Sequence, residues 1–150
     1  MDELTIFYRL LLAVILGGLV GFERERSHKF AGLRTHTLVA LAAALVTMTA
    51  LYGFDRPSSE ASARIIANIL VGIGFIGGGA ILRQDTRVIG TTTAATLFIV
   101  AAIGIAVGVG FLYAAITTTI ITYIILTIMW RLERKIEGSN HESETFHPHS

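Results

Sequence analysis

The sequence predicts an all-α polytopic transmembrane helical bundle of five spans, with the N-terminus outside and the C-terminus in the cytoplasm. Three observations lead to this prediction. Of the 150 residues, 53% are hydrophobic and only 15% are charged, whereas soluble domains carry about 25% charged residues. Several uncharged runs are long enough to cross a bilayer. Lys and Arg are concentrated in alternate loops, as expected for cytoplasmic segments.

The uncharged runs define the five spans in order along the chain. A spanning helix needs about 20 residues, and the first three runs each fit one crossing, at about 4–22, 35–54 and 65–82. No charged residue lies between 88 and 130. One helix over that run would be about 65 Å long, about twice the hydrocarbon core. We therefore expect a turn at Gly108-Val109-Gly110, between spans at about 91–108 and 111–130.

The two ends of the chain complete the expected domain organisation. The first span is expected to be retained rather than cleaved as a signal peptide, because Met1-Asp2-Glu3 is acidic and no small-residue cleavage site precedes Glu23. Arg9 lies within this span, where we expect it to anchor the helix end at the outer interface by snorkelling. The transmembrane domain would cover 1–137, and the polar residues 138–150 would form a disordered tail.

The orientation follows from the positive charges of the loops. Lys and Arg residues on one side of the predicted membrane number nine, against two on the other. The nine lie in the first loop, the third loop and the C-terminal segment, and the two lie in the second loop. Because positive loops remain in the cytoplasm, the first and third loops and the C-terminus are expected inside the cell. Five spans place the termini on opposite sides, so span count and charge agree.

Glycines four residues apart predict close packing between helices. Small residues at this spacing allow backbones to approach closely within lipid. Such glycines occur on the first, third and fourth spans: Gly17, Gly21, Gly74, Gly78, Gly104 and Gly108. The same small faces could serve a homo-oligomer or a membrane-protein partner, in addition to the lipid bilayer that surrounds all five spans.

The third span ends on three consecutive glycines, Gly77-Gly78-Gly79. One alternative is a broken helix whose freed carbonyls face a protein-lined cavity. The other is a continuous helix with tightly packed neighbours. Further along, the run from Gly90 to Thr93 opens the fourth span, where threonine hydroxyls can cap exposed N–H groups. Together these segments predict a polar vestibule on the cytoplasmic side.

A cluster of oxygen-bearing side chains is expected at the same cytoplasmic face. Mg²⁺ prefers oxygen ligands and keeps several waters, and Arg34 could hold such a cluster together by pairing with Glu23 or Asp85. The candidate metal ligands are Glu23, Glu25, Asp85, Thr92 and Thr93. Alternatively, the Glu and Arg residues of 23–26 form a self-paired interface segment in contact with lipid headgroups. His36 is expected to form hydrogen bonds rather than to bind metal.

Composition and motifs exclude several other classes of protein. The chain has no cysteine, so it has no disulfide, thiolate nucleophile or Cys-ligated zinc site. A net charge of +1 gives no field to recruit nucleic acid. The sequence contains no phosphate-binding loop, nucleophile elbow or zinc helix. We therefore expect a protein that is not an enzyme, with Mg²⁺ as its one candidate cofactor.

Four ordered strings resemble the MgtC/SapB membrane family over about residues 4–137. They are GFERE (21–25), AGLRTH (31–36), GIGFIGGGAIL (72–82) and GTTTAATLF (90–98). The resemblance implies a multi-pass bacterial inner-membrane protein linked to magnesium homeostasis and to adaptation to magnesium limitation. It also implies an alternative role as a small regulator that docks on a larger ion-translocating complex, such as F-type ATP synthase.

The resemblance also assigns individual motif residues. Those that carry over are Glu23, Arg24, Glu25, Gly32, Arg34, Thr35, Gly77, Gly79, Gly90, Thr92 and Thr93. Thr91 and Phe98 depart from the family pattern, which commonly has Leu and Trp there. The chain is expected to be of the short, SapB-like branch that lacks a C-terminal soluble domain.

Overall fold

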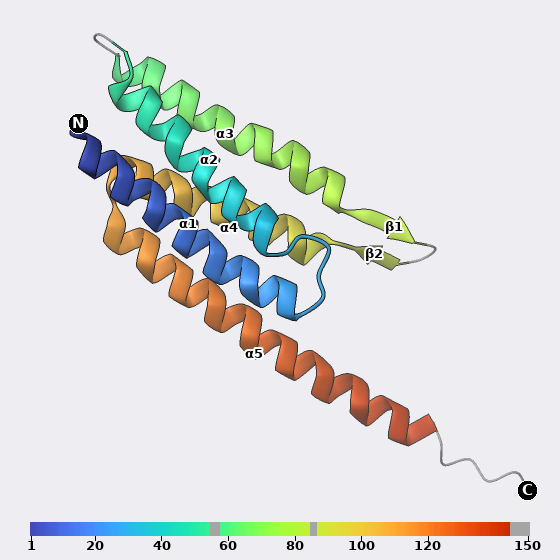
Figure 1. The fold of residues 1–150 in the computed structure, drawn as a ribbon. Helices are drawn as coiled ribbons and strands as arrows, with labels where there is room; N and C mark the ends of the chain where they lie inside the picture. The colour runs from blue at the N-terminus through green and yellow to red at the C-terminus, as the bar shows by residue number, and fades with distance from the viewer. Residues whose placement is uncertain (55–57, 85–86, 145–150) are drawn as a thin grey trace, which may run out of the picture.

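The computed structural model describes residues 1–54, 58–84 and 87–144, and it describes the backbone alone for residues 83, 84, 87, 130 and 132–144. Five helices run side by side in these segments (Figure 1). Their bounds are α1 Glu3–Arg26, α2 Leu33–Tyr52, α3 Ser59–Ala80, α4 Thr91–Val109 and α5 Leu112–Glu144. Each contains a segment long and apolar enough to cross a membrane, which in α5 is Leu112–Met129. The prediction of five spans is confirmed at this level, whereas the orientation stays a prediction.

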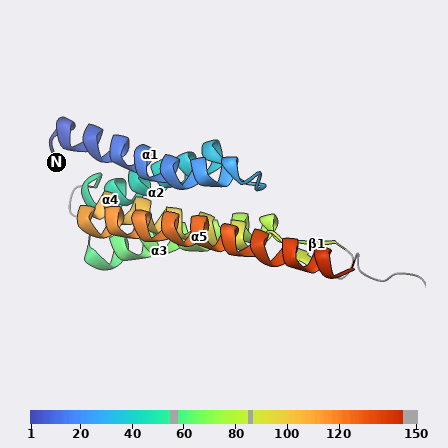
Figure 2. The same cartoon turned by 90° about the horizontal axis from the view of Figure 1, so that it is seen from below.

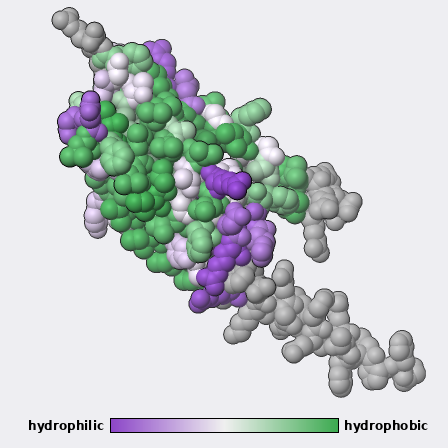
Figure 3. All heavy atoms as spheres, viewed as in Figure 1, coloured by the Kyte–Doolittle hydropathy of each residue, from purple (hydrophilic) through white to green (hydrophobic). Residues whose placement is uncertain are grey.

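The outer surface of the bundle is apolar, as contact with lipid requires. Phe75 on α3 is 86% exposed and Tyr113 on α5 is 85% exposed. Figure 3 shows hydrophobic side chains over most of one face, with hydrophilic side chains gathered towards its ends. In water such a continuous apolar surface would drive association. It is therefore the expected surface of a protein embedded in a bilayer.

A short β-hairpin joins α3 to α4, and the expectation of a purely helical chain misses it. Strands β1 (Leu82–Gln84) and β2 (Arg87–Ile89) pair antiparallel, with Leu82 opposite Ile89. The hairpin extends beyond the ends of α3 and α4 (Figure 1). Three-residue strands lie below the length at which apolar alternation can be read from sequence.

Two boundaries differ from the expected ones. Helix α3 starts at Ser59, earlier than expected, because Ser58 caps it by accepting a hydrogen bond from the Ala61 N–H at 3.1 Å. Helix α5 continues to Glu144, so residues 138–144 are helical where a disordered tail was expected. The remainder of that tail, 145–150, lies outside the described residues.

Helix α2 lies between two glycine-bearing faces, one from α1 and one from α4. On α1, a Cβ added at Gly17 would lie 2.6 Å from the Ala40 Cβ, and one at Gly21 would lie 2.8 Å from the Leu33 Cα. On α4, a Cβ at Gly108 would lie 2.7 Å from the Thr47 Cβ, and one at Gly104 would overlap the Ala40 carbonyl. The packing roles predicted for these four glycines are confirmed.

The glycines of α3 do not behave in the same way. Figure 2 shows α3 and α1 on opposite sides of the bundle, with α2 and α4 packed against both. A Cβ at Gly74, Gly78 or Gly79 would meet nothing within 4 Å. Gly77 approaches α4, with its Cβ position 3.4 Å from the Ala94 Cβ. Gly74 therefore has no close neighbour among the described residues of this chain, and its predicted packing role stays a prediction for a contact with another chain.

The three consecutive glycines lie in continuous helix, since α3 runs to Ala80 without a break. The alternative of a broken helix at this point is therefore wrong. Helix α3 ends where the Ile81 N–H donates to the Gly78 carbonyl at 3.2 Å. In contrast, the predicted turn after the fourth span is confirmed, because Gly110 adopts φ +103° directly after Val109.

Arg9 holds this turn from the side. Its Nη1 donates a hydrogen bond to the Gly108 carbonyl at 2.9 Å, and a Cβ on Gly110 would lie 2.7 Å from Nη2. The last carbonyls of a helix have no partner within the helix, so the guanidinium caps the C-terminal end of α4. Arg9 thus joins α1 to the α4–α5 turn, while its snorkelling to the outer interface stays a prediction.

Candidate functional site

Ionisable side chains are buried where α1 ends and α2 begins. Glu23 is 6% exposed and Arg24 is 3% exposed, on the last turn of α1. His36, on the first turns of α2, is fully buried. Burying charge costs several kcal/mol unless it is paired and hydrogen-bonded, and within a membrane such groups mark functional sites. We define Glu23, Arg24 and His36 as the buried polar cluster.

Glu23 has unequal partners at its two carboxylate oxygens. The Ser27 hydroxyl donates to Oε1 at 2.7 Å. Oε2 is buried and lies 3.9 Å from Arg24 Nη1, which is too long for a hydrogen bond. Within the described part of the chain, Oε2 has no hydrogen-bond partner. One side of this carboxylate is therefore available to a further donor or to a cation.

Arg24 occupies the position expected for Arg34. Arg34 is expected to pair with Glu23 or Asp85, but in the described residues the cation that contacts Glu23 is Arg24, and Asp85 lies outside those residues. Arg34 is exposed near the start of α2. The sequence pattern does not predict which arginine contacts Glu23. Glu23 and Arg24 are adjacent in the alternating Glu and Arg residues of 23–26, and both are buried at the end of α1.

The two ring nitrogens of His36 contact the N-cap of α2 and a hydroxyl of α4. Nδ1 lies 2.8 Å from the Gly32 carbonyl and must donate to it, because a carbonyl oxygen only accepts. Nε2 lies 3.0 Å from the hydroxyl of Thr96, which also contacts the Thr93 carbonyl at 2.9 Å. The expectation that His36 forms hydrogen bonds is confirmed.

Glu25 points away from the buried polar cluster and closes the loop between α1 and α2. Its Oε2 accepts a hydrogen bond from the Leu33 N–H at 3.0 Å, at the start of α2. A Cβ on Gly32 would overlap this carboxylate, so a side chain there would require the Glu25 carboxylate to move. Glu23 and Glu25 thus lie on different sides of α1, as expected for residues two apart on a helix.

The remaining predicted ligands are divided in the same manner. Thr93 is 2% exposed, whereas Thr92 is exposed on the first turn of α4. Asp85 lies outside the described residues. Across the described segments, no three His, Cys, Asp or Glu side chains lie close enough to hold a metal ion. The structure therefore brings Glu23 to the buried polar cluster and leaves Glu25 and Thr92 apart from it.

Gly90 is required by its backbone conformation. It precedes α4 with φ +89°, and a Cβ there would overlap the Ala80 carbonyl. Among the described residues no side-chain hydrogen bond caps this helix start, so the capping role expected of the threonines is not found there. Gly90 instead allows the backbone that follows β2 to pass close to the Ala80 carbonyl at the end of α3.

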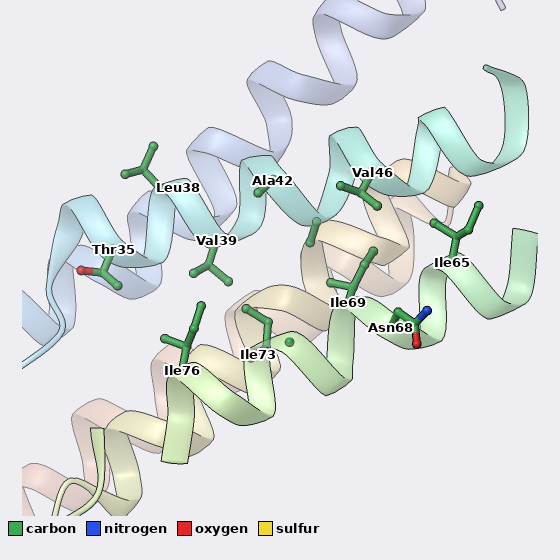
Figure 4. A pocket seen from close by; sticks show the side chains of 12 residues that line it. Thr35, Leu38, Val39, Ala42, Val46, Ile65, Asn68, Ile69, Ile73 and Ile76 are labelled. Carbon is green, nitrogen blue, oxygen red and sulfur yellow. The ribbon is translucent and has the colours of Figure 1, made fainter. Parts of the chain in front are cut away.

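A groove between α2 and α3 opens on the side of the bundle. It has a volume of about 610 Å³, and Figure 4 shows Thr35 near one end, isoleucines of α3 along its length and Asn68 nearer the other end. A second hollow of about 330 Å³ shares Thr35 and Ile76 with it and reaches Phe30 and Gly79. These hollows are predominantly apolar, so Thr35 and Gly79 line a lipid-like surface rather than a polar vestibule.

A much smaller cavity lies between the end of α1 and α5. Its volume is about 50 Å³, and it is lined by Glu23, Arg26, Ser27, Tyr123, Thr127 and Arg131. The hydroxyl oxygen of Thr127 is buried and, like Glu23 Oε2, has no hydrogen-bond partner among the described residues. Helix α5 thus contributes to the site, although nothing in the spacing of its sequence points to Tyr123 or Thr127.

The comparisons with known proteins now identify the family. A model of the MgtC family matches residues 10–135. The chain belongs to the MgtC family. It is 37% identical over 139 residues to "Putative magnesium transporter YhiD" of Escherichia coli (strain K12), an alignment covering 89% of this chain and 64% of YhiD.

Two further relatives of this MgtC family member extend the comparison. "Protein MgtC" of Brucella abortus (strain 2308) is 38% identical over 137 residues, covering 91% of this chain and 56% of that protein. "Protein SrpB" of Synechococcus elongatus is 36% identical over 144 residues, an alignment that covers 89% of this chain and 79% of SrpB. The chain therefore spans less than two thirds of YhiD and of the Brucella protein. No solved structure matches it.

Proposed function

We propose that this MgtC family protein is a multi-pass inner-membrane protein of magnesium homeostasis, and that Glu23 is the residue through which it binds or conducts Mg²⁺. The observation that carries the proposal is the buried Glu23 carboxylate, whose Oε2 has no hydrogen-bond partner among the described residues. A buried ionisable side chain at the end of a membrane span is energetically costly, and such residues mark functional sites. The name of YhiD, which refers to magnesium transport, supports the same class of function.

Growth under magnesium limitation tests this proposal. A deletion strain would be complemented with the wild type, with Glu23→Gln or with Glu60→Gln. Glu60 is the matched control, because its side chain is 87% exposed in an ion pair with Arg64 on α3. We expect Glu60→Gln to restore growth and Glu23→Gln to fail, with a parallel loss of Mg²⁺ binding by the purified protein.

Folding must be separated from function in this test. Thermal unfolding in detergent reports whether Glu23→Gln folds. Ser27→Ala provides a second variant, because it removes the hydrogen bond to Glu23 Oε1 while keeping the charge. Full complementation and unchanged Mg²⁺ binding by a folded Glu23→Gln protein would remove Glu23 from the mechanism.

The second candidate function is a small regulator that docks in the membrane on a larger ion-translocating complex, such as F-type ATP synthase. The observation in its favour is the side of α3 that carries Gly74 and Gly78, where a Cβ would meet nothing within 4 Å. Helices approach closely at such faces. A photo-cross-link from Val71, which is 72% exposed, should capture the complex, and Gly74→Leu should abolish the capture while Mg²⁺ binding persists.

A further inference from the structure

The small cavity between α1 and α5 lies at the level where lipid headgroups begin. Arg26 is the last residue of α1, and Arg131 lies just beyond the apolar segment of α5 that ends at Met129. Both arginines are exposed and line the cavity, together with the buried Glu23. In a membrane, this position corresponds to the boundary between hydrocarbon and the polar interface.

The inner part of the cavity presents oxygen atoms that have no donor. Glu23 is 94% buried, since only 6% of it is exposed, and its Oε2 and the Thr127 Oγ1 are buried without a hydrogen-bond partner in the described segments. Buried polar groups in native proteins are almost always satisfied by protein, water or ligand. The cavity of about 50 Å³ is large enough for a small group that donates to both oxygens.

The charges around the cavity indicate the chemical class of the ligand. A lone divalent cation would be attracted by Glu23 but repelled by Arg26 and Arg131, which line the same cavity. A lone phosphate would be attracted by the two arginines but repelled by the Glu23 carboxylate. A ligand that carries a positive group and a negative group a few bonds apart matches both parts of the cavity.

We propose that this cavity binds the headgroup of an aminophospholipid. The primary ammonium would donate hydrogen bonds to Glu23 Oε2 and Thr127 Oγ1, since an ammonium has three N–H donors. The phosphodiester would lie against Arg26 and Arg131, whose guanidinium groups recognise phosphate well. The acyl chains would then run along the exposed apolar side chains of α1 and α5. This inference does not rest on the proposed role in magnesium homeostasis, and it assigns Glu23 Oε2 to the ammonium, so the lipid and Mg²⁺ compete for this oxygen.

Lipid selectivity of the purified full-length protein tests the proposal. Thermal unfolding in detergent would be followed with added phosphatidylethanolamine, phosphatidylcholine or phosphatidylglycerol of identical acyl chains, and bound lipid would be counted by native mass spectrometry. Phosphatidylcholine keeps both charges but its ammonium has no N–H donor, and phosphatidylglycerol keeps only the phosphate. We expect phosphatidylethanolamine to bind about tenfold more tightly than either, as one lost hydrogen bond to a charged group predicts. Equal binding of any other lipid would overturn the proposal.

Soluble fragments of the headgroup identify the source of the phosphate chemistry. Inorganic phosphate and phosphoethanolamine would be added in place of lipid in the same unfolding assay. The proposed ligand needs its acyl chains for affinity, because lipidation contributes free energy with every buried CH₂ group. We therefore expect neither fragment to raise the unfolding temperature at concentrations where the lipid does. Saturable stabilisation by inorganic phosphate alone would overturn the proposal.

Four variants connect the selectivity to the cavity. Arg131→Ala should weaken binding of all three lipids by about tenfold, because each carries the phosphodiester. Thr127→Val should reduce the preference for phosphatidylethanolamine, and Glu23→Gln should abolish it. Arg64→Ala is the control, since Arg64 lies exposed near the start of α3. Because Arg131 is exposed, its replacement leaves the fold intact even if Glu23→Gln fails to fold.

The effect of Arg131→Ala separates the two proposals, because the variant should change Mg²⁺ binding and lipid binding in opposite directions. If the cavity were a site for Mg²⁺ alone, Arg131→Ala would remove a repelling charge and strengthen stabilisation by Mg²⁺. If an aminophospholipid occupies it, Arg131→Ala weakens lipid binding and does not strengthen the effect of Mg²⁺. Stronger Mg²⁺ stabilisation together with unchanged affinity for phosphatidylethanolamine in Arg131→Ala would overturn the inference.

Discussion

At the scale of single residues, several polar side chains near the helix ends join one helix to another. The Arg9 guanidinium reaches the Gly108 carbonyl, the Glu25 carboxylate holds the Leu33 N–H, and the Ser62 hydroxyl donates to the Ala50 carbonyl at 2.6 Å. In lipid no water competes for these backbone groups. Each such side chain therefore fixes the end of one helix against another element.

Replacing Arg9 tests its capping role. Arg9→Met keeps much of the apolar stem and removes the donor to the Gly108 carbonyl. We expect a loss of about 2 kcal/mol in the free energy of unfolding, the size of a hydrogen bond from a charged group. Arg64→Met is the control and should change stability little, because its ion pair is exposed. Equal unfolding temperatures for the two variants in detergent would show that Arg9 does not cap α4.

The Thr96 hydroxyl can be tested with a nearly isosteric change. Thr96→Val leaves His36 Nε2 buried without the partner that lies at 3.0 Å in the wild type. We expect a cost of about 1–3 kcal/mol in the free energy of unfolding. Thr92→Val, on an exposed position of the same helix, should cost little, and a chemical-denaturation series on both variants measures the difference.

At the scale of helices, the bundle depends on close approach of α2 to both α1 and α4. The glycines of α1 and α4 face Ala40 and its neighbours on α2, which brings three backbones together where larger side chains could not fit. Helix α3 packs with far less of its surface. Only 11% of its apolar membrane-spanning segment is buried, against 44% of the corresponding segment of α2. The same residue type therefore has different roles in different helices.

A pair of glycine substitutions separates these roles. In Gly104→Ala the new methyl would overlap the Ala40 carbonyl, so overpacking should cost about 1–3 kcal/mol. In Gly78→Ala the methyl enters open space, and the higher helix propensity of Ala should stabilise the protein by up to about 1 kcal/mol. Unfolding temperatures of the two variants in the same detergent are expected to move in opposite directions.

The sequence predicts the positions of the five spans well, but it predicts which helices pack against one another less well. Uncharged runs locate all five spans because lipid imposes a minimum length on each. The pairs Gly17/Gly21 and Gly74/Gly78 look alike in sequence, yet only the first pair faces a helix within the chain. Likewise, the sequence singles out Glu23 but not Thr127, because a contact between α1 and α5 has no sequence spacing from which to read it.

At the scale of the whole molecule, both loops that border the buried polar cluster lie at one end of the bundle. The α1–α2 loop and the β-hairpin lie at this end in Figure 1, and the N-terminus and the α4–α5 turn lie at the other. The positive-inside rule places the first end in the cytoplasm. Glu23, His36 and the small cavity would then lie near the cytoplasmic end of the bundle.

Thiol labelling tests this orientation. The chain has no cysteine, so Lys29→Cys and Glu60→Cys can each be introduced as a single reactive group, both at exposed positions. A membrane-impermeant reagent should label Glu60→Cys in intact cells or spheroplasts and Lys29→Cys only in inside-out vesicles. Labelling of Lys29→Cys from the outside would reverse the orientation and place the cluster on the external face.

The contact between Arg9 and Gly108 also constrains the order in which the protein is made. The two residues are 99 positions apart, so Arg9 leaves the ribosome and enters the bilayer long before its acceptor has been synthesised. Chains are made and begin to fold from the N-terminus, and a guanidinium without its acceptor within lipid is costly. The contact between Arg9 and the end of α4 can therefore form only after α4 has been synthesised, which makes it a late step of assembly.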